Sequence, residues 1–111
     1  MPIFISQGRY TREAIRGMIT KPEDRADAVS RLFAKGGGRL LNYYVTFGEY
    51  DFLVIGEAPS ETQMAAILMA AAGGGGVSDL RTTLAINSLE AKGALAAAGD
   101  LAPTFRSAGG V

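Results

Sequence analysis

The residues best suited to chemistry gather around one short segment near the middle of the chain. Asp51 is a carboxylate of the kind that acts as a general base or anchors a ligand, and Tyr44 and Thr46 precede it with two hydroxyl groups. Arg81 is the basic residue best placed to pair with this carboxylate in the folded chain. These four side chains are the candidate ligand-binding residues, and in an enzyme Tyr44, Asp51 and Arg81 would handle an aromatic or carbonyl substrate.

Asp51 also has a purely structural interpretation. It follows Gly48 and Tyr50, and an Asp beside a turn commonly accepts hydrogen bonds from backbone N–H groups. In this interpretation Gly48 makes the turn and Tyr50 packs against its neighbours. A carboxylate buried without a partner is costly, so we expect Asp51 to contact either Arg81 or backbone N–H groups.

Two missing residue types exclude several classes of site. The sequence has no Cys, which excludes disulfides, thiolate nucleophiles and Cys-ligated zinc or iron–sulfur sites. It has no His, which excludes a His general base, a Ser-His-Asp triad and an axial His for haem. The spacing of Asp51, Glu57 and Asp79 does not support a carboxylate metal site, and the glycines 73–76 lack the Lys-Ser/Thr of a phosphate loop. We therefore expect no metal and no cofactor.

The elements that must position these residues follow the order β-α-β-β-α-β. Strands are expected over residues 3–6, 40–47, 50–57 and 79–88 from their β-branched and aromatic content. A helical segment starts at Thr11, restarts at a capping box over residues 20–23, and ends at the glycines 36–38, as one kinked helix or two short ones. Another helix starts from the capping box over residues 60–63 and ends at the glycines 73–76. This order is typical of the ferredoxin-like α+β fold with an antiparallel sheet.

The two central strands are expected to form a hairpin with Gly48-Glu49 as its turn. A two-residue loop with Gly first predicts a type II′ turn, in which that residue has positive φ. One face of the hairpin then suits packing under the helices, with three cross-strand pairs: Phe47 with Tyr50, Val45 with Phe52, and Tyr43 with Val54.

The opposite face of this hairpin is also apolar. It carries Tyr44, Leu53 and Ile55 at its centre, with Asn42, Thr46 and Asp51 around them. Helices cover only one face of such a sheet, and an exposed apolar patch usually marks a partner surface. We therefore expect a second copy of the chain to cover it.

Length and charge bound the remaining possibilities. The 111 residues leave room for one domain, and 11 Lys and Arg balance 11 Asp and Glu, which argues against nonspecific nucleic-acid binding. No stretch predicts a membrane span or a signal peptide, so we expect a cytoplasmic protein. Residues 1–90 are assigned to the folded domain and residues 91–111, rich in Ala and Gly, to a flexible extension, with docking through Leu101 and Phe105 as the alternative.

The segment Gly48-Glu49-Tyr50-Asp51, with an apolar strand and Glu57-Ala58-Pro59 behind it, resembles the GYD domain family, named for its Gly, Tyr and Asp. Similar residues stand in that family at Arg25, Gly36-Gly37, Tyr44, Thr46 and Arg81-Thr82-Thr83-Leu84. The resemblance covers roughly residues 2–90 and implies a dimeric α/β barrel, in which two ferredoxin-like sheets enclose a central space. It implies little about activity, because the wider superfamily includes cofactor-independent monooxygenases, haem enzymes and ligand-sensing modules.

These observations favour a small homodimeric accessory or regulatory protein that binds a small molecule in the barrel space or under the helices. The alternative is a cofactor-independent oxygenase or isomerase-type enzyme, which needs Tyr44, Asp51 and Arg81 at a cavity into which Asp51 points. A third possibility is a structural assembly module. Tyr43, Tyr44 and Tyr50 either line an aromatic pocket or pack with their hydroxyls at its rim.

Overall fold

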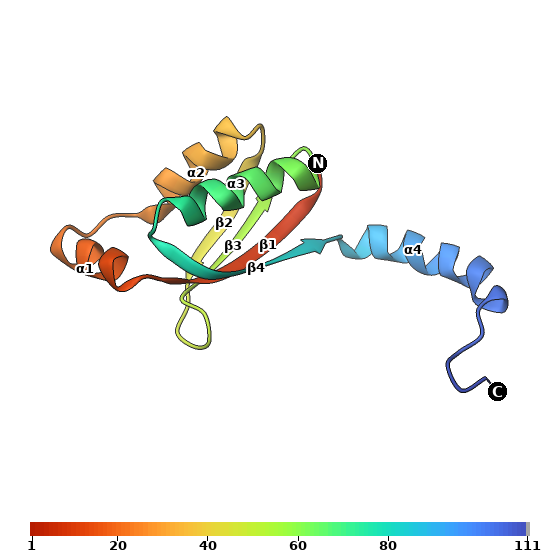
Figure 1. The fold of residues 1–111 in the computed structure, drawn as a ribbon. Helices are drawn as coiled ribbons and strands as arrows, with labels where there is room; N and C mark the ends of the chain where they lie inside the picture. The colour runs from red at the N-terminus through yellow and green to blue at the C-terminus, as the bar shows by residue number, and fades with distance from the viewer. Residues whose placement is uncertain (111) are drawn as a thin grey trace.

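A four-stranded antiparallel sheet with helices on one face forms the body of the protein (Figure 1). The computed structural model describes residues 1–110, and the strands lie in the order β2-β3-β1-β4. The elements along the chain are β1 (Ile3–Tyr10), α1 (Arg12–Thr20), α2 (Arg25–Lys35), β2 (Arg39–Val45), β3 (Phe52–Glu57), α3 (Glu61–Gly73), β4 (Val77–Ala85), α4 (Ser88–Leu101) and a short 3₁₀ turn (Ala102–Thr104). The predicted ferredoxin-like α+β fold is confirmed.

Side-chain caps set where the helices begin. The Thr11 hydroxyl accepts a hydrogen bond from the Ala14 N–H at 3.2 Å, and the Ser60 hydroxyl accepts one from the Gln63 N–H at 3.2 Å. Both caps agree with the sequence pattern. The cap expected at Thr20 is wrong: α1 and α2 are separate helices, Thr20 ends the first, and the carboxylate of Asp24 caps the second.

The core lies between the sheet and the helices α2 and α3 (Figure 1). It is formed by seven buried apolar residues: Phe4, Phe33, Phe52, Val54, Ala58, Met64 and Ile67. Tyr43, Phe52 and Val54 face this core as predicted. Val45 shares this side of the sheet with its partner Phe52, but Val45 and Phe47 are 59% and 98% exposed. They lie outside the core because the helices end before they reach this end of the hairpin (Figure 1).

The hairpin turn differs from its prediction. The pairs Val45–Phe52 and Tyr43–Val54 are confirmed, but the closing hydrogen bond joins the Thr46 N–H to the Asp51 carbonyl at 2.9 Å. Residues 47–50 therefore form the loop, Phe47 and Tyr50 do not pair, and Gly48 does not have positive φ. The type II′ prediction is wrong because long-range contacts hold this loop: the Asp51 N–H donates to the Gly8 carbonyl at 2.8 Å.

The face of the sheet away from α2 and α3 carries no helix within the described part of the chain (Figure 1). Leu53 pairs with Tyr44 and with Gln7, and Ile55 pairs with Ile5, so these side chains share that face. Tyr44 is 54% exposed, and the isoleucines and Leu53 are half-buried. We call Ile5, Tyr44, Leu53 and Ile55 the open apolar face.

The C-terminal segment is more helical than expected. Beyond β4, the Asn87 side chain caps α4 by accepting a hydrogen bond from the Glu90 N–H at 2.8 Å. The helix points away from the sheet (Figure 1), and its Leu89, Leu95 and Leu101 are 75%, 72% and 66% exposed. The cap and the many alanines offset the two glycines that weaken this helix. Flexibility of the extension stays a prediction.

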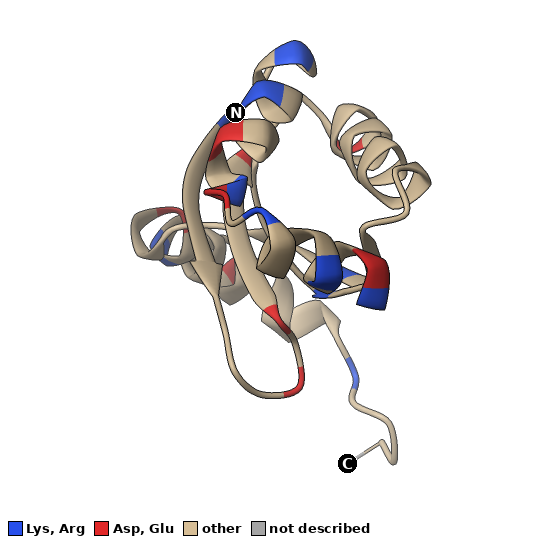
Figure 2. Cartoon of the chain, turned by 90° about the vertical axis from the view of Figure 1, so that its left-hand side faces the viewer, with Lys and Arg blue, Asp and Glu red and all other residues tan. Residues whose placement is uncertain are grey.

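Charged residues of both signs are interspersed over the helices and strand ends (Figure 2). Residues 1–39 carry eight basic and four acidic side chains, whereas residues 40–111 carry three and seven. Ion pairs join the two parts, with Arg9 contacting Asp79 at 3.2 Å and Arg39 contacting Glu57 at 3.0 Å. The charge asymmetry along the sequence is thus partly neutralised within the fold.

Candidate functional site

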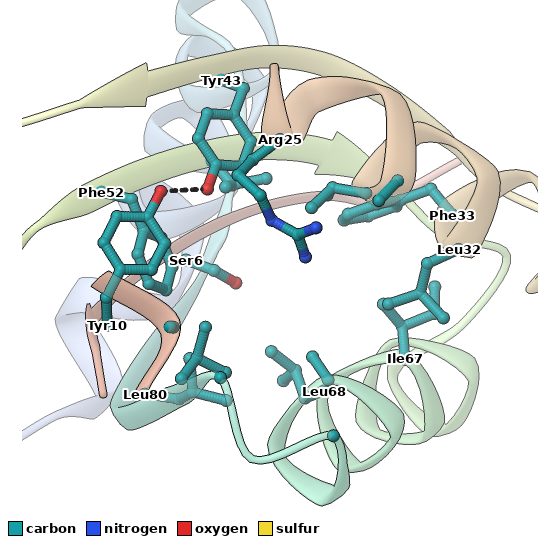
Figure 3. Close-up of a pocket in the computed structure, with 18 of the residues that line it drawn as sticks. Ser6, Tyr10, Arg25, Leu32, Phe33, Tyr43, Phe52, Ile67, Leu68 and Leu80 are labelled. Atoms are coloured by element: carbon teal, nitrogen blue, oxygen red, sulfur yellow. Dashed lines mark hydrogen bonds between the residues drawn. The ribbon is translucent and has the colours of Figure 1, made fainter. Parts of the chain in front are cut away.

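A cavity of about 360 Å³ lies between the sheet and the helix layer (Figure 3). Its volume falls within the range of small-molecule sites, roughly 300–1,000 Å³. Its walls are mostly aliphatic and aromatic, and include Val29, Leu32, Phe33, Ile67, Leu68 and Leu80. Its polar groups come from Ser6, Tyr10, Glu23, Arg25 and Tyr43.

Alternation along β1 places Ser6 and Tyr10 on the side of the sheet that faces the helices. Gly8 lies between them because no side chain fits there: a Cβ would come within 2.7 Å of the Phe52 ring and 2.8 Å of Leu80. This close approach lets Phe52 and Leu80 form the cavity wall beside Tyr10.

Tyr10 and Tyr43 meet through a hydrogen bond between their hydroxyl groups, across the ring of Phe52 (Figure 3). The ring centroids of Tyr10 and Tyr43 lie 5.2 Å and 6.2 Å from that of Phe52. Burial, and to a lesser extent the hydrogen bond with Tyr10, raises the pKa of Tyr43 well above its usual value, and the nearby charge of Arg25 only partly opposes this. The Tyr43 hydroxyl therefore stays protonated at neutral pH.

Arg25 is the first residue of α2 and directs its guanidinium group toward the middle of the cavity (Figure 3). Its Nη1 contacts the Glu23 carboxylate at 3.2 Å, and both side chains remain partly exposed. Ser6 lies deeper in the cavity wall and its hydroxyl is 2.9 Å from that of Thr82. A cation and three hydroxyls thus converge on one side of a largely apolar cavity.

None of the four predicted ligand-binding residues lines this cavity. Tyr44 and Arg81 lie in one row across the sheet, Tyr44–Leu53–Gln7–Arg81, on the open side. They stand on the two edge strands, so three strand spacings, about 14 Å, separate them. The Thr46 hydroxyl donates to the Tyr50 carbonyl at 2.6 Å. The structure therefore does not join these residues into one site.

Asp51 binds backbone rather than Arg81. Its Oδ2 accepts a hydrogen bond from the N–H of Tyr10 at 2.9 Å, which is one of the two expected kinds of partner. The enzyme alternative requires Asp51 to point into a cavity, but Asp51 does not line this one. Its carboxylate instead fixes the end of β1, whose last residue carries a cavity hydroxyl.

The rest of the Gly-Tyr-Asp segment anchors the same end of β1. The Arg9 guanidinium lies 5.2 Å from the ring centroid of Tyr50, a cation–π contact, and its Nε donates to the Glu49 carbonyl at 3.0 Å. Together with Asp51, these contacts bind the hairpin loop to Arg9 and Tyr10. The motif therefore acts at the cavity indirectly, by positioning Tyr10.

We predict that Asp51→Ala lowers the free energy of unfolding by about 1–3 kcal/mol, because it leaves the partly buried Tyr10 N–H without its acceptor. Asp51→Asn keeps an oxygen at this position and should cost less. Urea denaturation measures both, with Glu49→Ala in the same loop as the control, since the Glu49 side chain is exposed. Equal stability of the Asp51→Ala and Glu49→Ala proteins would refute the anchoring role.

The residues that do line the cavity differ in how clearly the sequence indicates them. Tyr43 is expected to face the helices and is a candidate for an aromatic pocket, whereas Arg25 stands out only as a position in the family pattern. Tyr10 escapes sequence reasoning because the first strand is expected to end at Ser6, whereas it continues to Tyr10. The glycine at position 8 hides this continuation.

Metal-binding clusters and membrane-spanning helices are both absent from the described chain. No cluster of three or more acidic side chains within residues 1–110 is arranged to hold a metal ion. No helix in this part of the chain has the length and apolar character needed to cross a membrane.

The fold is similar to several solved structures. The crystal structure of TTHA0845 from Thermus thermophilus matches with a TM-score of 0.51 and 16% identity, over 79% of this chain and 96% of that one. FFRP-DM1 matches with a TM-score of 0.49 and 18% identity, over 78% of this chain and all of that one. The hypothetical protein PHS023 from Pyrococcus horikoshii has a TM-score of 0.48 and 17% identity, over 79% and 93%. Such low identities concern the fold alone.

The sequence comparisons give a more specific result. No match was found among curated proteins. The family model of the GYD domain matches residues 4–95, which is most of the chain and includes the Gly48, Tyr50 and Asp51 motif. The resemblance seen in the sequence is thereby confirmed, and the chain belongs to the GYD domain family.

Proposed function

We propose that this protein binds a small molecule in the cavity between its sheet and helices, in an accessory or regulatory role. The observation that carries the proposal is the cavity itself, about 360 Å³ with apolar walls and a few converging polar groups. This combination is characteristic of ligand sites. Protein interiors are otherwise packed closely, with few voids larger than a water molecule.

The residues at the cavity support this function better than they support a filled structural core. The guanidinium of Arg25 and the hydroxyls of Tyr10 and Tyr43 border apolar walls, where a core would carry matching apolar side chains. Polar groups at such a position hold either water or the polar part of a ligand. A ligand would also contact the sheet and the helices α2 and α3 at once. Its binding could therefore change how these elements pack, which a regulatory role requires.

We also propose that the protein acts as a homodimer through the open apolar face. Ile5, Tyr44, Leu53 and Ile55 form a continuous surface that the described chain does not cover. Burial of such a face against a second copy would remove it from water, and obligate interfaces of this kind typically bury roughly 2,000 Å² or more. The cavity lies on the other side of the sheet, so both surfaces can be occupied together.

The ligand proposal predicts different effects of Phe at two neighbouring alanines of α3. Ala71 lines the cavity, whereas Ala72 is exposed. In a thermal-shift screen against metabolites, compounds that raise the Tm of the wild-type protein should raise it equally in Ala72→Phe. They should fail to do so in Ala71→Phe, because the new ring occupies the cavity.

Circular dichroism on both variants checks that each retains the fold. Compounds that stabilise Ala71→Phe as strongly as the wild type would place binding outside this cavity, for example in the space between two sheets. A complete absence of stabilising compounds would instead favour the structural assembly module.

A further inference from the structure

We propose that the ligand is an amphipathic monocarboxylate, with its carboxylate at Arg25 and its apolar body toward α3. This inference depends on the proposed function and specifies its ligand class. It combines the position of the charged group, the number of charges in the cavity wall, and the distribution of apolar side chains.

The polar end of the cavity offers donors to an anion. Arg25 has five N–H donors in a planar fork, and within residues 1–110 it uses Nη1 toward Glu23 while the rest of the group lies toward the cavity. In the Tyr10–Tyr43 pair one hydroxyl donates to the other, which leaves one hydroxyl proton for another acceptor. A planar carboxylate matches this set, since it accepts from a guanidinium fork and a hydroxyl at the same time.

The charges in the wall limit the ligand to at most one negative charge. Among residues 1–110, Arg25 is the only basic residue in the lining and Glu23 the only acidic one, and the two already contact each other at 3.2 Å. A phosphate monoester, with nearly two negative charges, would meet one cation and a repelling carboxylate. A cationic ligand would meet Arg25 itself at the centre of the cavity (Figure 3).

The opposite end of the cavity determines the chemical character and size of the rest of the ligand. Leu32, Ile67 and Leu68 face the space there and offer no hydrogen-bonding side chains (Figure 3). At about 30 Å³ for each water-sized group, a cavity of about 360 Å³ holds roughly a dozen non-hydrogen atoms. A medium-length alkyl or aryl-alkyl carboxylate has this size.

Decanoate, decan-1-ol and decylamine are matched probes because they share one chain and differ in the charge of the head group. Isothermal titration calorimetry should show that the wild-type protein binds decanoate more tightly than decan-1-ol and does not bind decylamine. In Arg25→Gln the decanoate affinity should fall by about 10- to 100-fold, while the decan-1-ol affinity stays nearly constant. Arg25→Lys, which keeps a point charge, should recover part of the decanoate affinity.

Arg31→Gln is the control, because Arg31 is an exposed residue of the same helix and does not line the cavity. It should bind decanoate like the wild type. Equal binding of decanoate and decan-1-ol, both abolished by Ala71→Phe, would overturn the carboxylate assignment and leave the cavity as a ligand site. Failure of decanoate to bind would also overturn it, whereas the metabolite screen on Ala71→Phe and Ala72→Phe decides the proposed function separately.

Discussion

Gly38→Ala is expected to lower the free energy of unfolding by about 3 kcal/mol, a large share of the total stability of a domain of this size. Gly38 joins α2 to β2, and a Cβ at this position would come within 2.0 Å of the Glu57 carbonyl oxygen and 3.1 Å of the Ala58 Cα. These are backbone atoms, so no side-chain rotation relieves the contact. The start of β2 would have to separate from the end of β3, although Arg39 pairs with Glu57 there.

Gly48→Ala is the matched control for this prediction. A Cβ at Gly48 meets no atom within 4 Å, and the residue does not have positive φ. We expect its effect on the free energy of unfolding to stay within about 0.5 kcal/mol, as for most surface substitutions. Urea denaturation of the two variants measures the difference. Similar stability losses would show that the strand ends at Gly38 and Glu57 are not held as closely as described.

The parts of the fold that were predictable depend on short-range patterns. Side-chain alternation in the central hairpin assigns Tyr43 and Val54 to one face and Leu53 to the other, and a single register satisfies both faces. The hydroxyls of Thr11 and Ser60 mark helix starts within three residues of their partners. Each of these patterns involves residues that are close together in the sequence. The sequence alone was therefore sufficient to predict the order of the elements and the antiparallel sheet.

The hairpin loop shows how a long-range contact overrides a local pattern. Gly48-Glu49 has the composition of a tight turn, but the N–H and carboxylate of Asp51 bind Gly8 and Tyr10, about forty residues earlier in the chain. Those bonds draw the chain toward β1 and leave a wider loop. The residues near Asp51 in the sequence do not indicate these partners. For this reason the sequence left two kinds of partner open for the Asp51 carboxylate, Arg81 or backbone N–H groups.

The cavity was harder to predict because its polar residues come from elements that are not neighbours in the chain or the sheet. Tyr10 on β1 and Tyr43 on β2 are separated by β3, and they meet only because both rings extend over Phe52. Arg25 joins them from the start of α2. Each residue alone suits an ordinary strand or helix, so only the tertiary arrangement identifies them as a group.

Leu53→Lys is expected to convert the proposed homodimer into a monomer. Leu53 lies at the centre of the open apolar face, paired with Tyr44 on one side and Gln7 on the other. In a face-to-face dimer a lysine here would bury an unpaired ammonium group, which is strongly unfavourable. In the monomer the same lysine can reach water. Size-exclusion chromatography with light scattering should therefore show a twofold lower mass than for the wild type.

Leu84→Lys is the control for this prediction, because it makes the same Leu-to-Lys change at a position outside the open apolar face. Leu84 pairs with Phe4 on the helix side of the sheet and is 51% exposed, so it lies on the opposite side from the open apolar face. Its replacement should leave the dimer mass unchanged. The Leu53→Lys monomer should also be less soluble, because Ile5, Tyr44 and Ile55 become permanently exposed to water. A wild-type protein that is a stable monomer at micromolar concentration, or a Leu53→Lys protein that keeps the dimer mass, would show that this face serves another purpose.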